Sequence, residues 1–188
     1  MAGQFSTICY IIVGTIIIFP EAHSKAVQVN FDATMELRIT KRFFLKYRSY
    51  REDHSVRDAK HCVSLLVMHN NFGTWDAILR YKLTPASGYT NKQVKIRPHH
   101  QSGTAGSINN MMRITEDGTG RQLYDQKLQY TNYGNCRVLV EQFSGRRHCS
   151  LWVSPEWRER PIPSACSSAY TDICTETHHI DDVQRCRG

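Results

Sequence analysis

The sequence predicts an all-β fold in which eight short antiparallel strands close into a barrel. Eight strand-like segments follow one another at meander spacing, and the gaps between them are too short for the helices of a parallel sheet. Two of the last segments begin at cysteines, as strands stapled by disulfides would. Eight strands in a barrel leave room inside for side chains or one small ligand. Residues 25–188 are long enough for one such domain with a sizeable core.

Residues 1–24 are predicted to be a signal peptide, so the mature protein is expected to be secreted. The apolar run from Ile8 to Phe19 is too short to cross a membrane as a helix. Ala22 and Ser24 follow it at the positions that a signal peptidase recognises, and a second cleavage position lies after Ala26. A buried N-terminal strand or helix is the alternative interpretation. No later segment resembles a membrane helix, so no membrane association is predicted.

A short helix is predicted to precede the strands, over residues 27–42. Asp32 is suited to be its N-cap, because an Asp carboxylate can accept hydrogen bonds from the free N–H groups of the first turn. Glu36 lies in that first turn, where a negative charge is favourable. Segment 43–50 then begins the β-structure with a run that is rich in aromatic residues, FFLKYRSY.

The remaining strands are indicated by apolar runs, by alternation and by the turn residues between them. Segment 75–83 shows the clearest alternation, because every second residue is apolar and most residues between them are charged. Turn-forming pairs such as Ser87-Gly88 and Ser144-Gly145 separate the segments. The strands expected after segment 43–50 are 61–70, 75–83, 92–98, 107–116, 121–130, 136–143 and 149–153.

Six cysteines remain after the predicted signal peptide, an even number as a disulfide framework requires. Six cysteines allow fifteen pairings, and their spacing alone does not choose among these. No CxxC pair is present and the spacings do not match a zinc finger, so neither a metal nor another cofactor is predicted. The six are Cys62, Cys136, Cys149, Cys166, Cys174 and Cys186.

The strand cysteines also predict which residues line the interior. If they face outward to reach the tail, their neighbours face inward, because side chains alternate along a strand. The inward set is then Val63, Leu65, Val67, Arg137, Leu139, Glu141, Ser150 and Trp152. Most of these are apolar, as a cavity lining should be. Arg137 is the exception and needs a partner: an ion pair with Glu141, water at the barrel mouth and an anionic ligand are the alternatives.

Charge and motifs limit the class of function. The net charge is +7, and the loss of Glu21 with residues 1–24 raises it by one. A basic protein can bind anions, but the Lys and Arg residues are scattered and form no run of five, so nucleic acid is not a predicted partner. The chain contains no nucleophile elbow, no HExxH and no phosphate loop, so it is not predicted to be an enzyme.

Several motifs together resemble the salivary lipocalins of ticks, which include the histamine-binding proteins. They are FFLKYRSYRED before a cysteine, YTNYGNC, HCSLWV, and the spacing to Cys166 and Cys186. The resemblance covers about Phe31 to Cys186. It implies an eight-stranded lipocalin barrel with a short N-terminal helix and a disulfide-tied C-terminal helix or tail. It also suggests the disulfides Cys62–Cys186 and Cys136–Cys166, with Cys149 then left to bridge Cys174.

Proteins of this kind resemble scavengers, so the resemblance implies that the partner is a small-molecule host mediator. Nothing in the sequence suggests more than a monomer. Amine-binding members carry an acid where this chain has Arg137 and a Glu where it has Ser150. Arg38 and Lys92 also align with acidic residues of such members. Three residues match those of the amine-binding members: Tyr50, Asp53 and Trp152. At a fourth position Tyr124 replaces another aromatic residue.

The basic replacements favour an anionic lipid, such as an eicosanoid or a fatty acid, as the ligand. Close cations repel an ammonium group, whereas an Arg side chain forks onto a carboxylate. An apolar tail would then lie along the interior of the barrel. The expected head-group partners are Arg38, Lys92, Arg113 and Arg137, each of which could instead be a solvated rim charge.

Two other functions remain open. One is the binding of a biogenic amine, histamine or serotonin, by Tyr50, Asp53 and Trp75 with Asp125. The other is inhibition of complement or of a protease through the segment 154–163, although its Trp157 is expected to pack against the barrel. Opposite ligand charge separates the amine from the lipid, and capture of a plasma protein would identify the inhibitor.

Overall fold

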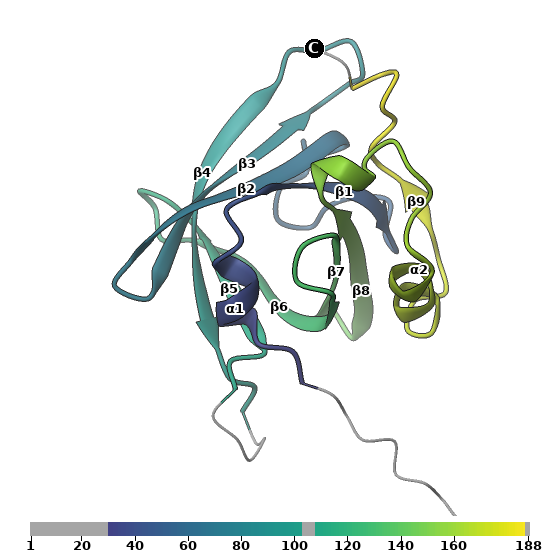
Figure 1. Cartoon of the computed structure of the whole chain (residues 1–188). Coiled ribbons are helices and arrows are strands. Elements are labelled where there is room, and N and C mark those ends of the chain that lie inside the picture. The colour runs from purple at the N-terminus through teal and green to yellow at the C-terminus, as the bar shows by residue number, and fades with distance from the viewer. Residues whose placement is uncertain (1–29, 103–107, 187–188) are drawn as a thin grey trace, which may run out of the picture.

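Eight antiparallel strands form a closed barrel, because the sheet order β2-β3-β4-β5-β6-β7-β8-β1 is completed by pairing of β1 with β2 (Figure 1). The computed structural model describes residues 30–102 and 108–186, and the predicted signal peptide lies outside them. The predicted fold class is therefore confirmed. The strands are β1 (Arg42–Arg48), β2 (His61–Asn71), β3 (Thr74–Lys82), β4 (Thr90–His99), β5 (Met111–Glu116), β6 (Gln122–Thr131), β7 (Cys136–Phe143) and β8 (Arg146–Val153).

Two-residue turns join β2 to β3 and β7 to β8. Their central residues have positive φ, 50° at Phe72 and 81° at Gly73, then 50° at Ser144 and 74° at Gly145. Two successive positive φ angles define the turn whose twist matches that of the flanking strands. Because the second turn is so tight, β8 begins three residues before the predicted segment 149–153.

The N-terminal helix is much shorter than predicted, since α1 contains only Ala33–Leu37. Asp32 is its N-cap and accepts a hydrogen bond of 2.8 Å from the Thr34 N–H. Two β-branched residues that disfavour a helix follow Arg38, and β1 begins soon afterwards. The backbone N–H of Ala33 donates to the Asn109 carbonyl, which places α1 at the barrel end where β4 leads to β5. Residues 27–29 lie outside the described residues.

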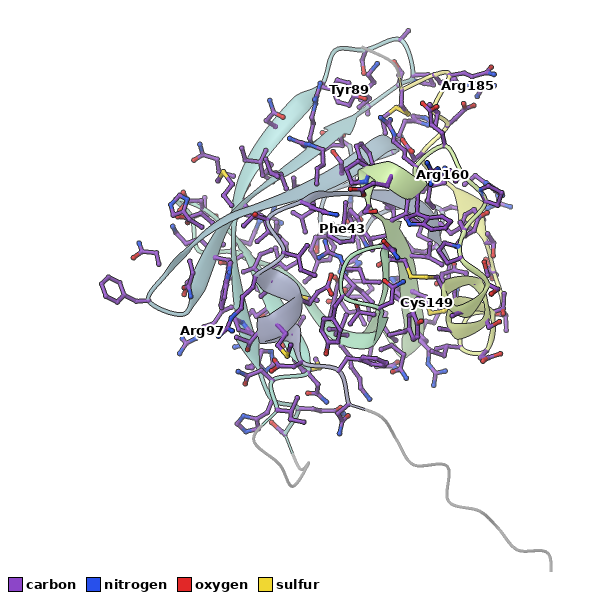
Figure 2. All side chains as sticks on the ribbon, in the orientation of Figure 1. Phe43, Tyr89, Arg97, Cys149, Arg160 and Arg185 are labelled. Carbon is purple, nitrogen blue, oxygen red and sulfur yellow. A yellow bond between two sulfur atoms is a disulfide. The ribbon has the colours of Figure 1, made fainter. Side chains whose placement is uncertain are left out.

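A second, smaller core lies outside the barrel wall, where α2 (Ser164–Thr171) covers β7 and β8 (Figures 1 and 2). Val138 and Leu151 face outward there and pack with Tyr170 of α2, while Trp157 packs at the edge. The disulfides Cys136–Cys166 and Cys149–Cys174 cross this core, and Cys62–Cys186 ties the tail to β2. These are the three pairings that the resemblance implied. The cysteines of β7 and β8 thus face outward, and their neighbours face the barrel interior.

The tail contributes a short strand that the sequence did not predict, β9 (His178–His179), which pairs with Tyr47 and Arg48 of β1. β2 pairs only with residues 42–44 of β1, so the remaining edge of β1 needs another partner. The tail supplies it, and the Ile180 N–H also donates to the Lys46 carbonyl. The structure also contains η1 (Pro155–Trp157). No helix among the described residues is long and apolar enough to cross a membrane.

Candidate functional site

The barrel interior encloses a small cavity near the loop of residues 49–60, at the end away from α1. Side chains from all eight barrel strands line it, and its wall is mainly apolar, with Leu79, Ile114 and Leu139 among the lining residues. The cavity has a volume of about 30 Å³, room for about two water molecules. Because the cavity is small and its wall is mainly apolar, its few polar groups determine which charge a ligand can carry there.

Asp53 is the first of two carboxylates at this end. It lies on the loop of residues 49–60, and only 6% of its surface is exposed. Its Oδ1 accepts hydrogen bonds from the Ser55 N–H at 3.0 Å, the Val56 N–H at 2.8 Å and the Tyr124 hydroxyl at 2.7 Å. The second oxygen, Oδ2, lies 4.0 Å from Nη1 of Arg48. These contacts fix the carboxylate in position beside the cavity and tie the loop to β6.

Glu141 on β7 is the second carboxylate, and its side chain is 10% exposed. One oxygen accepts a hydrogen bond of 2.9 Å from the Asp125 N–H, and the other lies 3.5 Å from Nε2 of His54. Burial, assisted by repulsion from Asp53 and Asp125 and opposed by the hydrogen bond from the Asp125 N–H, raises the pKa of Glu141 to about 7. Its charge therefore changes near neutral pH.

Aromatic and imidazole rings surround the two carboxylates. The ring of Tyr50 stacks on His148 with centroids 4.7 Å apart, and His54 stacks on Phe143 at 3.9 Å. Tyr124 meets His54 edge to face at 5.5 Å. Burial lowers the pKa of both His54 and His148, so these rings stay neutral at pH 7. We name this group the acidic site; it comprises Tyr50, Asp53, His54, Tyr124, Glu141, Phe143 and His148.

Four of the nine predicted ligand-binding residues line the cavity: Tyr50, Asp53, Tyr124 and Trp152. The indole N–H of Trp152 donates to the Ser150 hydroxyl at 2.9 Å, so this buried donor is satisfied within the protein. Trp75 is buried in the interior core but does not belong to the cavity lining.

The four predicted head-group cations are not brought together. Arg38 is exposed at the end of α1, and Arg113 on β5 forms an ion pair of 2.9 Å with Asp125 outside the cavity. Lys92 lies on the inward register of β4, where its ammonium group pairs with Glu116. The fourth cation, Arg137, is buried at the end of the barrel that α1 covers.

The partner of Arg137 is Glu36 of α1, whose Oε1 lies 3.6 Å from Nη1, so the suggested pair with Glu141 is wrong. The Thr131 hydroxyl donates to the other Glu36 oxygen at 2.6 Å, and the guanidinium lies 4.3 Å from the Phe43 ring centroid. Glu141 lies further along β7, toward the opposite end of the barrel from α1. Arg137 is therefore already neutralised within the protein.

The sequence analysis did not name four members of the acidic site as ligand-binding residues. Glu141 was expected inside the barrel, but only as a partner of Arg137, and His54, Phe143 and His148 were not named at all. His148 was missed because the predicted strand began at residue 149; from Arg146 onward, alternation places His148 on the inward face with Ser150. Phe143 is the last residue of β7, and the tight turn at Ser144 and Gly145 follows it directly. His54 lies on an irregular loop and had no periodic signal.

A groove on the outer surface reaches the acidic site from the solvent. It has a volume of about 710 Å³, and its lining includes Tyr50, Arg51, His148 and Glu176. Tyr50 borders both the groove and the interior cavity, so the Tyr50–His148 stack forms the wall between them. Among residues 30–102 and 108–186, no three His, Cys, Asp or Glu side chains gather closely enough to hold a metal ion.

Comparison with known proteins identifies one matching family. A family model described as tick histamine binding protein matches residues 21–186, which is most of the chain. No curated protein sequence matches.

Solved structures share the barrel at low sequence identity. Japanin from Rhipicephalus appendiculatus, in a structure with cholesterol, has a TM-score of 0.57 and 16% identity over 77% of this chain and 95% of its own. The cockroach allergen Per a 4 has a TM-score of 0.54 and 9% identity, covering 80% and 88%. H1 crustacyanin from the lobster Homarus americanus has a TM-score of 0.53 and 9% identity, and the match covers 77% of each chain. At these identities the similarity concerns the fold.

Proposed function

The chain belongs to the tick histamine binding protein family, and we propose that it binds a small cationic amine, of the histamine or serotonin kind, in the acidic site. The observation that carries this proposal is the pair of carboxylates among aromatic rings, Asp53, which is buried, and Glu141, whose side chain is 10% exposed. The candidate cations for an anionic ligand are exposed or paired elsewhere. Binding of a small molecule, rather than catalysis, is the role that the family and the barrel support.

An ammonium group that leaves water needs carboxylates to offset its lost hydration. Aromatic rings add to this, because their faces attract cations. Asp53 is partly neutralised by Arg48, so Glu141 provides the additional negative charge. Amine-binding relatives were expected to have a Glu at the position of Ser150, and Glu141 faces the same interior from the neighbouring strand. Glu141 thus replaces the carboxylate that Ser150 lacks.

Ligand entry requires that side chains move, because the cavity holds about two water molecules. The Tyr50–His148 stack separates the cavity from the outer groove, and the loop of residues 49–60 covers the barrel end through Asp53. An amine entering from the groove would displace this stack and take the place of His54 beside Glu141. Long irregular loops of this kind commonly close over a ligand.

The proposed biological role is the removal of a host inflammatory mediator by a secreted protein. Three disulfides are typical of proteins that leave the reducing cytosol, and residues 1–24 are proposed as the signal peptide. A protein that holds the mediator in its barrel lowers the free concentration of that mediator and so blunts the host defence.

An anionic lipid is the second candidate ligand, favoured by two observations. The cavity wall is largely apolar, and Lys92 shares the inward register of the lining residue Val94. Released from Glu116, its ammonium group could meet a fatty acid carboxylate while the tail displaces apolar side chains.

Parallel calorimetric titrations of oxidised protein with histamine, serotonin and leukotriene B4 test these proposals. We expect at least one amine to bind with a Kd in the micromolar range or tighter, and the lipid to bind at least tenfold more weakly. Tight binding of the lipid alone would replace the amine proposal by the lipid one. Binding of none of the three would overturn both ligand classes in their present form.

Amine affinity should rise with pH across neutrality. Because the pKa of Glu141 is raised to about 7, its ionised fraction increases from about 10% at pH 6 to about 90% at pH 8. Only the ionised form attracts an ammonium group, so the affinity for serotonin, which stays cationic over this range, should increase up to about tenfold. Titration at pH 6, 7 and 8 measures this, and a flat profile would remove Glu141 from the site.

A further inference from the structure

Basic residues that are scattered along the sequence gather on the outer barrel wall around Tyr89. Arg42 lies on β1, Arg80 and Lys82 lie on β3, and Arg158 follows η1. Figure 2 labels Tyr89 and Arg185, and the residue after Arg185, Cys186, contacts the Tyr89 hydroxyl. We name Arg42, Arg80, Lys82, Tyr89 and Arg158 the basic cluster.

Tyr89 organises the cluster. The Arg80 guanidinium lies 3.6 Å from the centroid of its ring, and the Lys82 ammonium lies 4.7 Å from it. The phenol hydroxyl donates to the Cys186 carbonyl at 2.7 Å, and Cys186 is linked to Cys62 of β2. The ring is therefore fixed by the tail, and it holds the two cations of β3 in place.

Three of the cations have no carboxylate partner. Arg42 donates to the Ser64 hydroxyl at 3.2 Å, and Lys82 donates weakly to the Pro85 carbonyl at 3.4 Å although only 7% of its surface is exposed. Nε of Arg80 is buried and has no hydrogen-bond partner. Between described residues, no ion pair involves any of these three side chains. Burial lowers the pKa of Arg42, and the neighbouring Arg80 adds to this effect through repulsion.

The carboxylate that pairs with Arg158 is Asp181, and its oxygens are already used. Asp181 accepts two hydrogen bonds of 2.9 Å from Arg158 and lies 3.9 Å from the Lys46 ammonium. The side chain of Asp181 is fully buried by these partners. Among the described residues, Arg42, Arg80 and Lys82 therefore leave about three positive charges uncompensated on this face, which an external anion can neutralise.

We propose that the basic cluster binds a sulfated polysaccharide of the glycosaminoglycan class. Guanidinium groups donate paired hydrogen bonds to tetrahedral and planar oxyanions, and a chain of sulfates can neutralise several cations at once. Single-stranded nucleic acids use free aromatic faces for base stacking, whereas Arg80 already covers the ring of Tyr89. Glycosaminoglycans are also polyanions of the extracellular space, which disulfide-bonded proteins share.

Affinity for a heparin-derived oligosaccharide, measured by calorimetry at several salt concentrations, tests this proposal. The variant R42Q/R80Q should bind at least tenfold more weakly than the unaltered protein at 0.15 M salt, with a shallower salt dependence. The matched control R97Q/R113Q removes the same charge from exposed arginines of β4 and β5 and should change the affinity less than threefold. Unchanged thermal unfolding shows that the variants fold.

Arg80 is partly buried, so the double variant could fail to fold. In that case the single variant R42Q is tested, and its affinity for the oligosaccharide is expected to fall about threefold or more. An equal loss in R97Q/R113Q would mean that net charge alone attracts the saccharide and would overturn the proposal. Tighter binding of single-stranded DNA of equal charge would overturn the choice of a sulfated polysaccharide.

Discussion

The replacement Glu141→Gln is expected to weaken amine binding about 30-fold or more at pH 8, because the loss of one buried charge partner commonly costs 2–5 kcal/mol. Glutamine keeps the shape of the side chain and can still accept the hydrogen bond from the Asp125 N–H. The change therefore removes charge with little other effect. Asp53→Asn should produce a loss of similar size, and the double variant should leave no measurable amine binding.

The control is Glu156→Gln, the same chemical change at an exposed glutamate that forms an ion pair of 3.0 Å with Lys41. It should leave the amine affinity unchanged, because such surface pairs contribute little. Glu141→Gln should also abolish the rise of affinity between pH 6 and 8. If Glu141→Gln bound amine as well as the unaltered protein did, the ammonium group would have to lie elsewhere. If Glu141→Gln changed the affinity for the lipid but not for the amine, the result would support the lipid proposal.

The barrel and its inward faces could be predicted because both depend on local patterns. Alternation along segment 75–83, and the outward-facing Cys136 of β7 and Cys149 of β8, fix which side chains face inward. The family resemblance, carried by short motifs, added the disulfides and pointed to Tyr50 and Asp53. Both residues border the cavity in the structure.

The partners of the inward charges could not be predicted, because they depend on contacts between distant segments. Glu36 meets Arg137 from far away in the sequence, and only the placement of α1 over one barrel end explains the pair. Alternation along β7 predicts that Arg137 and Glu141 both face the barrel interior. It does not predict which residue each of them contacts, because those contacts come from segments at opposite ends of the barrel. The basic cluster likewise appears only when the tail is tied back to β2.

Substitutions in the Glu36–Arg137 ion pair are expected to cause the largest loss of folding stability. Glu36 is fully buried and Arg137 is 1% exposed, and two guanidinium nitrogens already lack partners. Removing Glu36 would leave a buried charge without its counterion, which costs about 3–5 kcal/mol. Glu36→Gln and Arg137→Met should each lower the free energy of unfolding by this amount in urea titrations of the oxidised protein.

The double variant distinguishes a true ion pair from two independent packing defects. With both charges gone, the methionine side chain that Arg137→Met introduces would fill the space beside Phe43, so the double variant should be clearly more stable than the sum of the single losses implies. Single losses below about 1 kcal/mol, or strict additivity, would contradict the pair. Amine affinity provides an independent check: α1 covers the end of the barrel away from the acidic site, so Glu36→Gln should bind histamine within twofold of the unaltered protein. A larger loss would mean that Arg137 acts on the ligand and that the two ends of the barrel are coupled.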